Sequence, residues 1–147
     1  MKNILFLCTG NSARSILAEA YMNRAGRDRW LAFSAGSKPT GRVNPLAIEV
    51  LSVYGINAGA AGSKSWNEFA GAGAPLMDVV VTVCDNAAGE ACPVWPPCGG
   101  KPPTKLHWSF PDPAAAKGSE DEKRQAFERV FAGIRARIDA FLESEPA

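Results

Sequence analysis

Short apolar runs alternate along this chain with segments of helical period, and this alternation restricts the fold more than any other feature. The runs cover residues 3–8, 30–34, 77–83 and 105–110 and have the composition of strands. Between and after them, apolar residues recur at spacings of three and four, as on one face of a helix. Strands that alternate with helices form a parallel sheet with covered faces. We therefore predict an α/β fold with a four-stranded parallel sheet and helices on both faces.

Residues that cap or stop helices mark the helical segments. The predicted N-caps are Asn44, Ser65 and Ser119, and the predicted stops are Gly26 and Gly55. Both serines have a glutamate three positions later, which is the pattern of a capping box. They predict a short helix over residues 66–70 and a long last helix that begins after residue 119.

Length and composition favour one domain over residues 1–147. A chain of this length with 46% hydrophobic residues can bury a single core. Its net charge of +1 provides no basic surface for nucleic acid. The first apolar run is far shorter than a signal-peptide core or a membrane span. We expect a cytoplasmic, monomeric protein that binds neither nucleic acid nor membrane.

The chain has four cysteines, Cys8, Cys84, Cys92 and Cys98. A structural disulfide framework is not expected in the cytoplasm. Burial as a small hydrophobe is the usual role of a free cysteine. However, each of these four lies beside a turn or a polar residue, and the last three fall close together. This distribution suggests that some of them are reactive.

Residues 8–15, Cys-Thr-Gly-Asn-Ser-Ala-Arg-Ser, connect the first predicted strand to the first predicted helix and are called the anion loop. In α/β sheets, ligands bind at the carboxyl ends of the strands. Backbone N–H groups in a tight turn, followed by a helix N-terminus, form a site for a tetrahedral oxyanion. The predicted oxyanion-binding residues are Thr9, Gly10, Asn11, Ser12, Ala13, Arg14 and Ser15.

The same loop contains a candidate nucleophile, Cys8. A helix N-terminus and a neighbouring arginine lower a thiol pKa from about 8.5 into the range of about 3.5 to 7.5. Arg14 would bind two oxygens of the anion, while the Ser15 hydroxyl would donate to the thiolate. The alternative is a plain strand-to-helix turn with an incidental cysteine. The combination of cysteine, anion cradle and arginine within eight residues favours the reactive interpretation.

Cys-x-Gly-Asn-x-x-Arg-Ser directly after a first strand resembles the low-molecular-weight protein tyrosine phosphatases and their arsenate reductase branch. The resemblance extends along nearly the whole chain. It includes Ser34-Ala35-Gly36, Val43-Asn44-Pro45, Val81-Thr82-Val83-Cys84, Cys92-Pro93, His107-Trp108 and Asp112-Pro113-Ala114. It implies a Rossmann-like three-layer fold. It also implies that Asp112 is the acid that protonates a leaving oxygen, although an aspartate between prolines is otherwise most often a turn residue.

Two features favour the reductase over the phosphatase. The phosphatases usually have aromatic residues after the Asp-Pro pair, whereas this chain has Ala114-Ala115-Ala116. The reduction of arsenate to arsenite takes two electrons, so it requires a disulfide to form. The resemblance assigns this shuttle to Cys84 and Cys92. The alternative is a phosphatase that hydrolyses phosphotyrosine or small aryl phosphates.

The resemblance implies a complete arsenate-detoxifying cycle. Cys8 attacks arsenate, Cys84 then attacks Cys8 and releases arsenite, and Cys92 takes over the disulfide from Cys8. Thioredoxin would reduce the resulting disulfide, with glutaredoxin or a small thiol as the other possible reductant. No bound cofactor is expected, and phosphate and sulfate should bind as oxyanion ligands.

Two other interpretations stay open on the sequence, and His107 carries a separate expectation. Cys84, Cys92, Cys98 and His107 could form a zinc site, although no Cys-x2-Cys pair is present. The chain could bind phosphate and sense oxidation without catalysis, but such a protein needs no acid loop. His107, the only histidine, is expected to pack near the end of the sheet.

Some reductases of the same branch bind a potassium ion behind the anion loop. Three residues of this chain match their ligands, Asn11, Glu19 and Ser34, whereas Lys64 falls near the position of a fourth ligand, an aspartate. An ammonium group has the charge of potassium and donates to the same oxygens, so Lys64 could replace the ion. The alternative is a solvated surface lysine.

Overall fold

The computed structural model describes residues 1–57, 62–71, 73–83 and 102–144 of the chain. The strands are β1 (Lys2–Leu7), β2 (Trp30–Ala35), β3 (Val79–Thr82) and β4 (Thr104–His107). The helices are α1 (Arg14–Ala25), α2 (Pro45–Val53) and α4 (Glu120–Ser144), with 3₁₀ helices η1 (Trp66–Phe69) and η2 (Pro113–Ala115). None of the helices in these ranges is long and apolar enough to cross a membrane.

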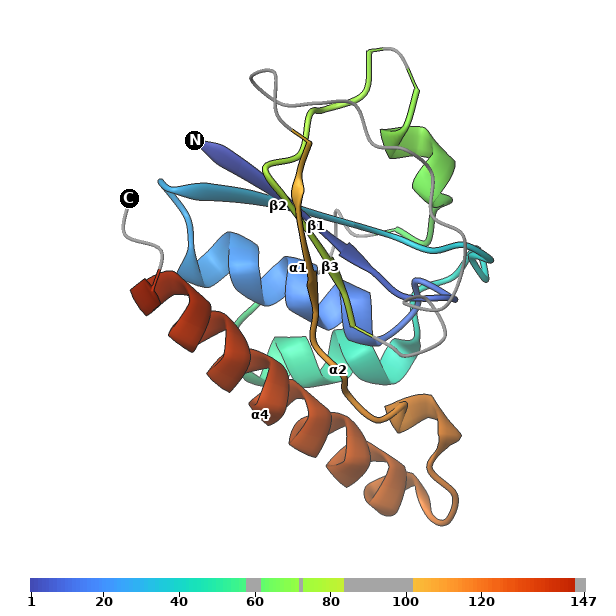
Figure 1. The fold of residues 1–147 in the computed structure, drawn as a ribbon. Helices are drawn as coiled ribbons and strands as arrows, with labels where there is room; N and C mark the ends of the chain where they lie inside the picture. The colour runs from blue at the N-terminus through green and yellow to red at the C-terminus, as the bar shows by residue number, and fades with distance from the viewer. Residues whose placement is uncertain (58–61, 72, 84–101, 145–147) are drawn as a thin grey trace.

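The four strands form one parallel sheet in the order β2-β1-β3-β4 (Figure 1). Each neighbouring pair is parallel, as shown by Leu7 opposite Ala35 and Thr82, and by Thr82 opposite His107. The carboxyl ends of the strands therefore meet at one edge of the sheet. The predicted four-stranded parallel sheet is confirmed.

The two faces of the sheet have different covers. Ile4 and Phe6 of β1 belong to a large core with α1, α2 and α4, which lie together on one side in Figure 1. Leu5 and Leu7 point the opposite way, because successive residues of a strand alternate between faces. They pack with residues of η1, Trp66 and Phe69, in a smaller core. Since both faces are buried, β1 has no polar alternation in its sequence.

Most of the predicted helix boundaries are confirmed, with one difference. Asn44 caps α2 by accepting a hydrogen bond from Leu46 N at 2.9 Å. Ser119 and Glu122 form the predicted capping box at the start of α4. Ser65 caps η1 through Asn67 N, so this segment is a short 3₁₀ helix and not the capping-box helix predicted over residues 66–70. One tight 3₁₀ turn is enough to place Trp66 and Phe69 against the sheet.

Candidate functional site

The backbone carbonyls of the anion loop are bound from the outside by the segment that follows β2. Lys38 N donates to Thr9 O at 2.9 Å and Thr40 N donates to Gly10 O at 3.0 Å. Asn44 N donates to Ser12 O at 2.8 Å. In a trans peptide the N–H points opposite to the C=O. The N–H groups of Gly10, Asn11 and Ala13 therefore point to the inside of the loop, where they can bind an anion.

The N-terminus of helix α1 lies at the end of the anion loop and provides further N–H groups. Its N-cap, Ala13, provides no side-chain hydrogen bond, and no acidic residue lies in its first turn. The first N–H groups of a helix carry a partial positive charge and need acceptors. A bound oxyanion would supply both the negative charge and the acceptors.

Cys8 directly follows β1 and begins the anion loop. Cys8 is 5% exposed, and its backbone N–H donates to Ala35 O at 3.2 Å. Gly36 makes this close approach possible. A Cβ at Gly36 would lie 2.4 Å from Thr9 O and 2.7 Å from Cys8 O, so any side chain there would displace the loop.

Asn11 has the left-handed backbone conformation that the loop requires, with φ of 46°. Asparagine adopts this conformation more readily than most residues. Its fully buried side chain accepts from Lys64 N at 2.8 Å and donates to Ser15 Oγ at 2.9 Å. Because Ser15 Oγ accepts this bond, its own proton is available to another acceptor.

Arg14 connects the anion loop to the segment of residues 109–113, called the acid loop. Its Nη1 donates to Phe110 O at 3.0 Å, and its Nη2 lies 3.9 Å from Asp112 Oδ2. Asp112 Oδ1 caps η2 by accepting from Ala114 N at 2.9 Å. The Arg14 Nε is buried and has no hydrogen-bond partner within the described ranges, which suits a donor that awaits an anion oxygen.

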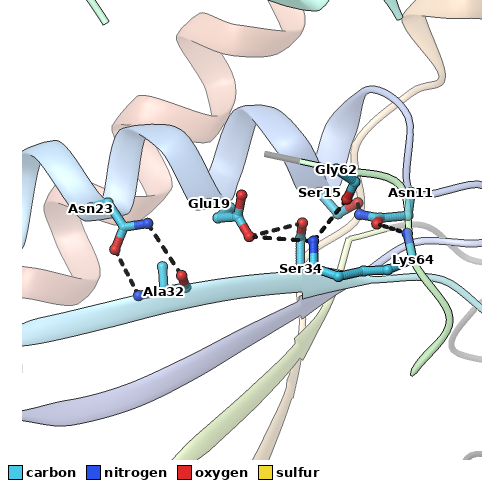
Figure 2. A network of polar contacts seen from close by, with 8 residues as sticks. All are labelled: Asn11, Ser15, Glu19, Asn23, Ala32, Ser34, Gly62 and Lys64. Carbon is cyan, nitrogen blue, oxygen red and sulfur yellow. Dashed lines mark hydrogen bonds and ion pairs between the residues drawn. The ribbon is translucent and has the colours of Figure 1, made fainter. Parts of the chain in front are cut away.

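Behind the anion loop, a buried polar network joins α1, β2 and residues 62–64 (Figure 2). Glu19 Oε1 accepts from Ser34 Oγ at 3.2 Å and lies 3.9 Å from Lys64 Nζ. The same Nζ donates to Gly62 O at 2.7 Å. Lys64 is thus linked to the anion loop by its backbone N–H, which donates to Asn11, and to α1 by its ammonium group, which lies beside Glu19.

Burial raises the pKa of Glu19 above its usual value, while Lys64 and the hydrogen bonds from Ser34 act in the opposite direction. A carboxylate this deeply placed needs a counter-charge. Lys64 supplies this charge, with its Nζ beside Glu19 Oε1 and bonded to Gly62 O. An ammonium group at this position does not suit a second cation beside the same carboxylate.

The structure brings together most of the residues singled out in the sequence. Cys8, Arg14 and Ser15 lie in the anion loop after β1, where Arg14 pairs with Asp112. Asn11, Glu19, Ser34 and Lys64 form the network behind this loop. The predictions for Cys84, Cys92 and Cys98 lie outside the described residues. Within the described ranges, no group of three His, Cys, Asp or Glu residues is arranged to hold a metal ion.

The predicted packing role of His107 is wrong. Its side chain is exposed at the end of β4, and its Nδ1 lies 2.7 Å from Thr82 Oγ1. The neighbouring Trp108 packs instead, with its ring centroid 6.0 Å from that of Phe6 and 5.8 Å from that of Phe141. Alternation along the chain explains the difference, because only one of two successive side chains can face the core.

Two contacts to the anion loop could not be predicted from the sequence. Ser63 Oγ donates to Gly10 O at 3.1 Å and so holds the loop from residues 62–66. The Phe110 carbonyl holds Arg14. No residue-type signal points to either contact, because serine is common in turns and any residue can provide a carbonyl.

Cys8, an arginine and an aspartate on a proline-flanked loop thus lie at the carboxyl edge of a parallel α/β sheet. A model of the family described as low molecular weight phosphotyrosine protein phosphatase matches residues 3–145. The chain belongs to this family.

The chain is also similar to proteins named arsenate reductases. The arsenate reductase of Halalkalibacterium halodurans is 38% identical over 143 residues, which are 97% of this chain and 96% of that protein. The solved arsenate reductase of Archaeoglobus fulgidus is 30% identical, with a TM-score of 0.67 over 94% of this chain and 97% of the other. A thioredoxin-dependent arsenate reductase of Corynebacterium glutamicum shares the fold, with 24% identity and a TM-score of 0.66 over 99% of this chain and 64% of the other.

Proposed function

We propose that this chain is an arsenate reductase in which Cys8 is the nucleophile and Arg14 binds the oxyanion. The observation that carries the proposal is the anion loop, with carbonyls bound outward, N–H groups turned inward and Cys8 at its start. The similarity to arsenate reductases over nearly the full length supports the choice of arsenate. The role would be detoxification of arsenate.

In the first step, the Cys8 thiolate attacks the arsenic of bound arsenate and forms an S–As bond. One oxygen leaves, and Asp112 donates the proton that makes it a good leaving group. The inward N–H groups and the Nε–Nη2 edge of Arg14 stabilise the charge on the remaining oxygens. Ser15 donates to the Cys8 sulfur while it is a thiolate.

In the second step, the Cys84 thiolate attacks the sulfur of Cys8. The S–As bond breaks, its electron pair stays on arsenic, and arsenite leaves as a Cys8–Cys84 disulfide forms. Cys92 then attacks Cys84, so Cys8 is released as a thiolate and a Cys84–Cys92 disulfide remains. An external dithiol reduces this disulfide, and thioredoxin is supported by the thioredoxin-dependent relative.

A direct comparison of two activities tests the proposal. The reduced protein should form arsenite from arsenate with thioredoxin, thioredoxin reductase and NADPH, and should hydrolyse aryl phosphates only weakly. Phosphatase chemistry needs Cys8, Arg14 and Asp112 alone, so aryl phosphate hydrolysis without any arsenite formation would favour the phosphatase alternative. Catalysis of neither reaction would favour a non-enzymatic oxyanion-binding protein.

We further propose that Lys64 takes the place of the potassium ion of related reductases. Its ammonium group is next to Glu19 and bonded to Gly62 O, which are the kinds of oxygens that coordinate potassium. A covalently attached cation is always present, so the loop would not depend on the ionic composition of the buffer.

Replacing Lys64 by alanine should destabilise the domain by about 2–3 kcal/mol at pH 7, because the buried Glu19 loses its partly exposed counter-charge. Lys64 lowers the pKa of Glu19 against the effect of burial, so its removal raises the folded-state pKa of Glu19 further, and the cost of the substitution grows as pH rises through that range. The loss should therefore shrink as pH falls from 7 toward 5, as measured by thermal unfolding. In a Glu19→Gln background, Lys64→Ala should cost less, and its cost should not change with pH. A cost that is independent of pH in both backgrounds would contradict the pairing.

Exchange of sodium for potassium at constant ionic strength should leave activity and melting temperature of the unmutated protein unchanged. In Lys64→Ala, potassium should restore part of the lost stability. Clear stabilisation of the unmutated protein by potassium over sodium would show that Lys64 does not replace the ion.

A further inference from the structure

Arg14 donates to the main-chain carbonyl of Phe110, which lies 96 residues further along the chain. Its side chain is 14% exposed, so the guanidinium group has little freedom to find other partners. Its Nη2 faces Asp112. Its Nε is buried and has no hydrogen-bond partner within the described ranges. The carbonyl contact thus determines how the plane of the guanidinium is turned.

The atoms of a guanidinium group are not equivalent toward an anion. Nε and Nη2 have N–H bonds that point side by side along one edge, and this edge pairs with two oxygens of a tetrahedral anion. Nη1 lies on the other side of the group. With Nη1 bound to Phe110 O, the Nε–Nη2 edge remains available for the oxyanion. The buried Nε without a partner agrees with this assignment.

Two features hold the Phe110 carbonyl in place. The ring of Phe110 lies against α4 at Gly133, where an added Cβ would be 3.7 Å from Cδ1 and Cε1 of the ring. Pro111 follows Phe110 in the sequence and restricts its backbone to extended conformations. The ring therefore fixes the position of the residue, and the proline limits the direction of its carbonyl.

We propose that Phe110 is a positioning residue for Arg14. Its ring docks on Gly133 of α4, and its carbonyl binds Nη1, so that the Nε–Nη2 edge faces the anion loop. The inference rests on the proposed function in one respect, the assignment of Arg14 as an oxyanion ligand. Because Phe110 and Asp112 lie on the same loop, one docking contact sets the arginine and the acid in register.

Phe110→Ala tests this role. The affinity of the reduced protein for inorganic phosphate is measured by NMR titration. The affinity should fall by about tenfold, as expected when a charge-assisted hydrogen bond loses its fixed geometry. Phe110→Leu should retain most of the affinity. Phe33→Ala is the matched control, since it also removes a half-buried phenylalanine ring, one that packs against Phe69 in the smaller core, and it should leave the affinity unchanged.

A double-mutant cycle with Arg14→Lys separates positioning from general loosening of the fold. Lysine has a point charge and no planar edge to be turned, so Phe110→Ala should have little further effect in that background. An equal loss of phosphate affinity in both backgrounds, or no loss in either, would overturn the inference. If Arg14→Lys itself leaves phosphate binding intact, the proposed site fails. If Arg14→Lys weakens binding but Phe110→Ala does not, only the positioning role fails.

Discussion

Replacing Cys8 with serine should abolish arsenate reduction while phosphate or sulfate still binds in the anion loop. The reaction needs a sulfur that can form a bond to arsenic and then a disulfide, and a serine hydroxyl can do neither. The anion, in contrast, is held by inward N–H groups and by Arg14, which the substitution leaves in place. Turnover should fall to the uncatalysed background, whereas phosphate affinity should change by less than about threefold.

Cys98→Ser is the matched control for this experiment, because it removes a thiol without removing any step of the proposed cycle. It should reduce arsenate at the normal rate. Arsenate reduction that persists in Cys8→Ser would rule out Cys8 as the nucleophile. Loss of both activity and anion binding would indicate that the thiol supports the loop structurally.

Cys84→Ser and Cys92→Ser should each stop multiple turnover with thioredoxin but leave weak aryl phosphate hydrolysis. The hydrolysis requires Cys8, Arg14 and Asp112, which neither substitution touches. The two variants should differ in a single turnover. Cys92→Ser should still release arsenite and stop as a Cys8–Cys84 disulfide, whereas Cys84→Ser should stop at the arsenic adduct.

Rapid-quench measurement of arsenite and mass spectrometry of the trapped disulfides distinguish these states. Normal reduction rates with thioredoxin in both variants would show that the shuttle assignment is wrong. In that case another thiol must resolve the adduct, and Cys98 would be the remaining candidate within the chain.

The part of the site that lies on consecutive residues was predictable from the sequence. A buried apolar run that breaks into a glycine-containing turn and continues as a helix defines a strand–loop–helix unit, and the structure has this unit in β1, residues 8–13 and α1. Cys8 and Arg14 could be singled out because both lie in that turn. The all-parallel sheet was predictable for the same reason, since strand and helix signals alternate.

Contacts made by backbone groups could not be predicted, because they leave no mark on residue type. Lys64 was singled out for its ammonium group, yet its backbone N–H is the group that binds Asn11. The Phe110 carbonyl is a second example. Gly36 appeared in the sequence only as part of a family pattern, and the steric reason for it required the 2.4 Å approach to Thr9 O.

The polar network behind the anion loop restrains the loop and the elements beside it. Asn11, in its left-handed conformation, is held at both ends of its amide, and Glu19 ties α1 to β2 through Ser34 (Figure 2). A loop held in this way does not need to reorganise when the anion binds, so more of the binding energy is available to the reaction.

A single-turnover experiment tests the central claim most directly. The reduced protein is mixed with excess arsenate in the absence of any external reductant, and arsenite and free thiols are counted together. We predict one arsenite per chain and the loss of two thiols, because the two electrons for arsenic come from one pair of cysteines. No arsenite and no loss of thiols, in a protein that still hydrolyses aryl phosphates, would contradict the account and identify the chain as a phosphatase.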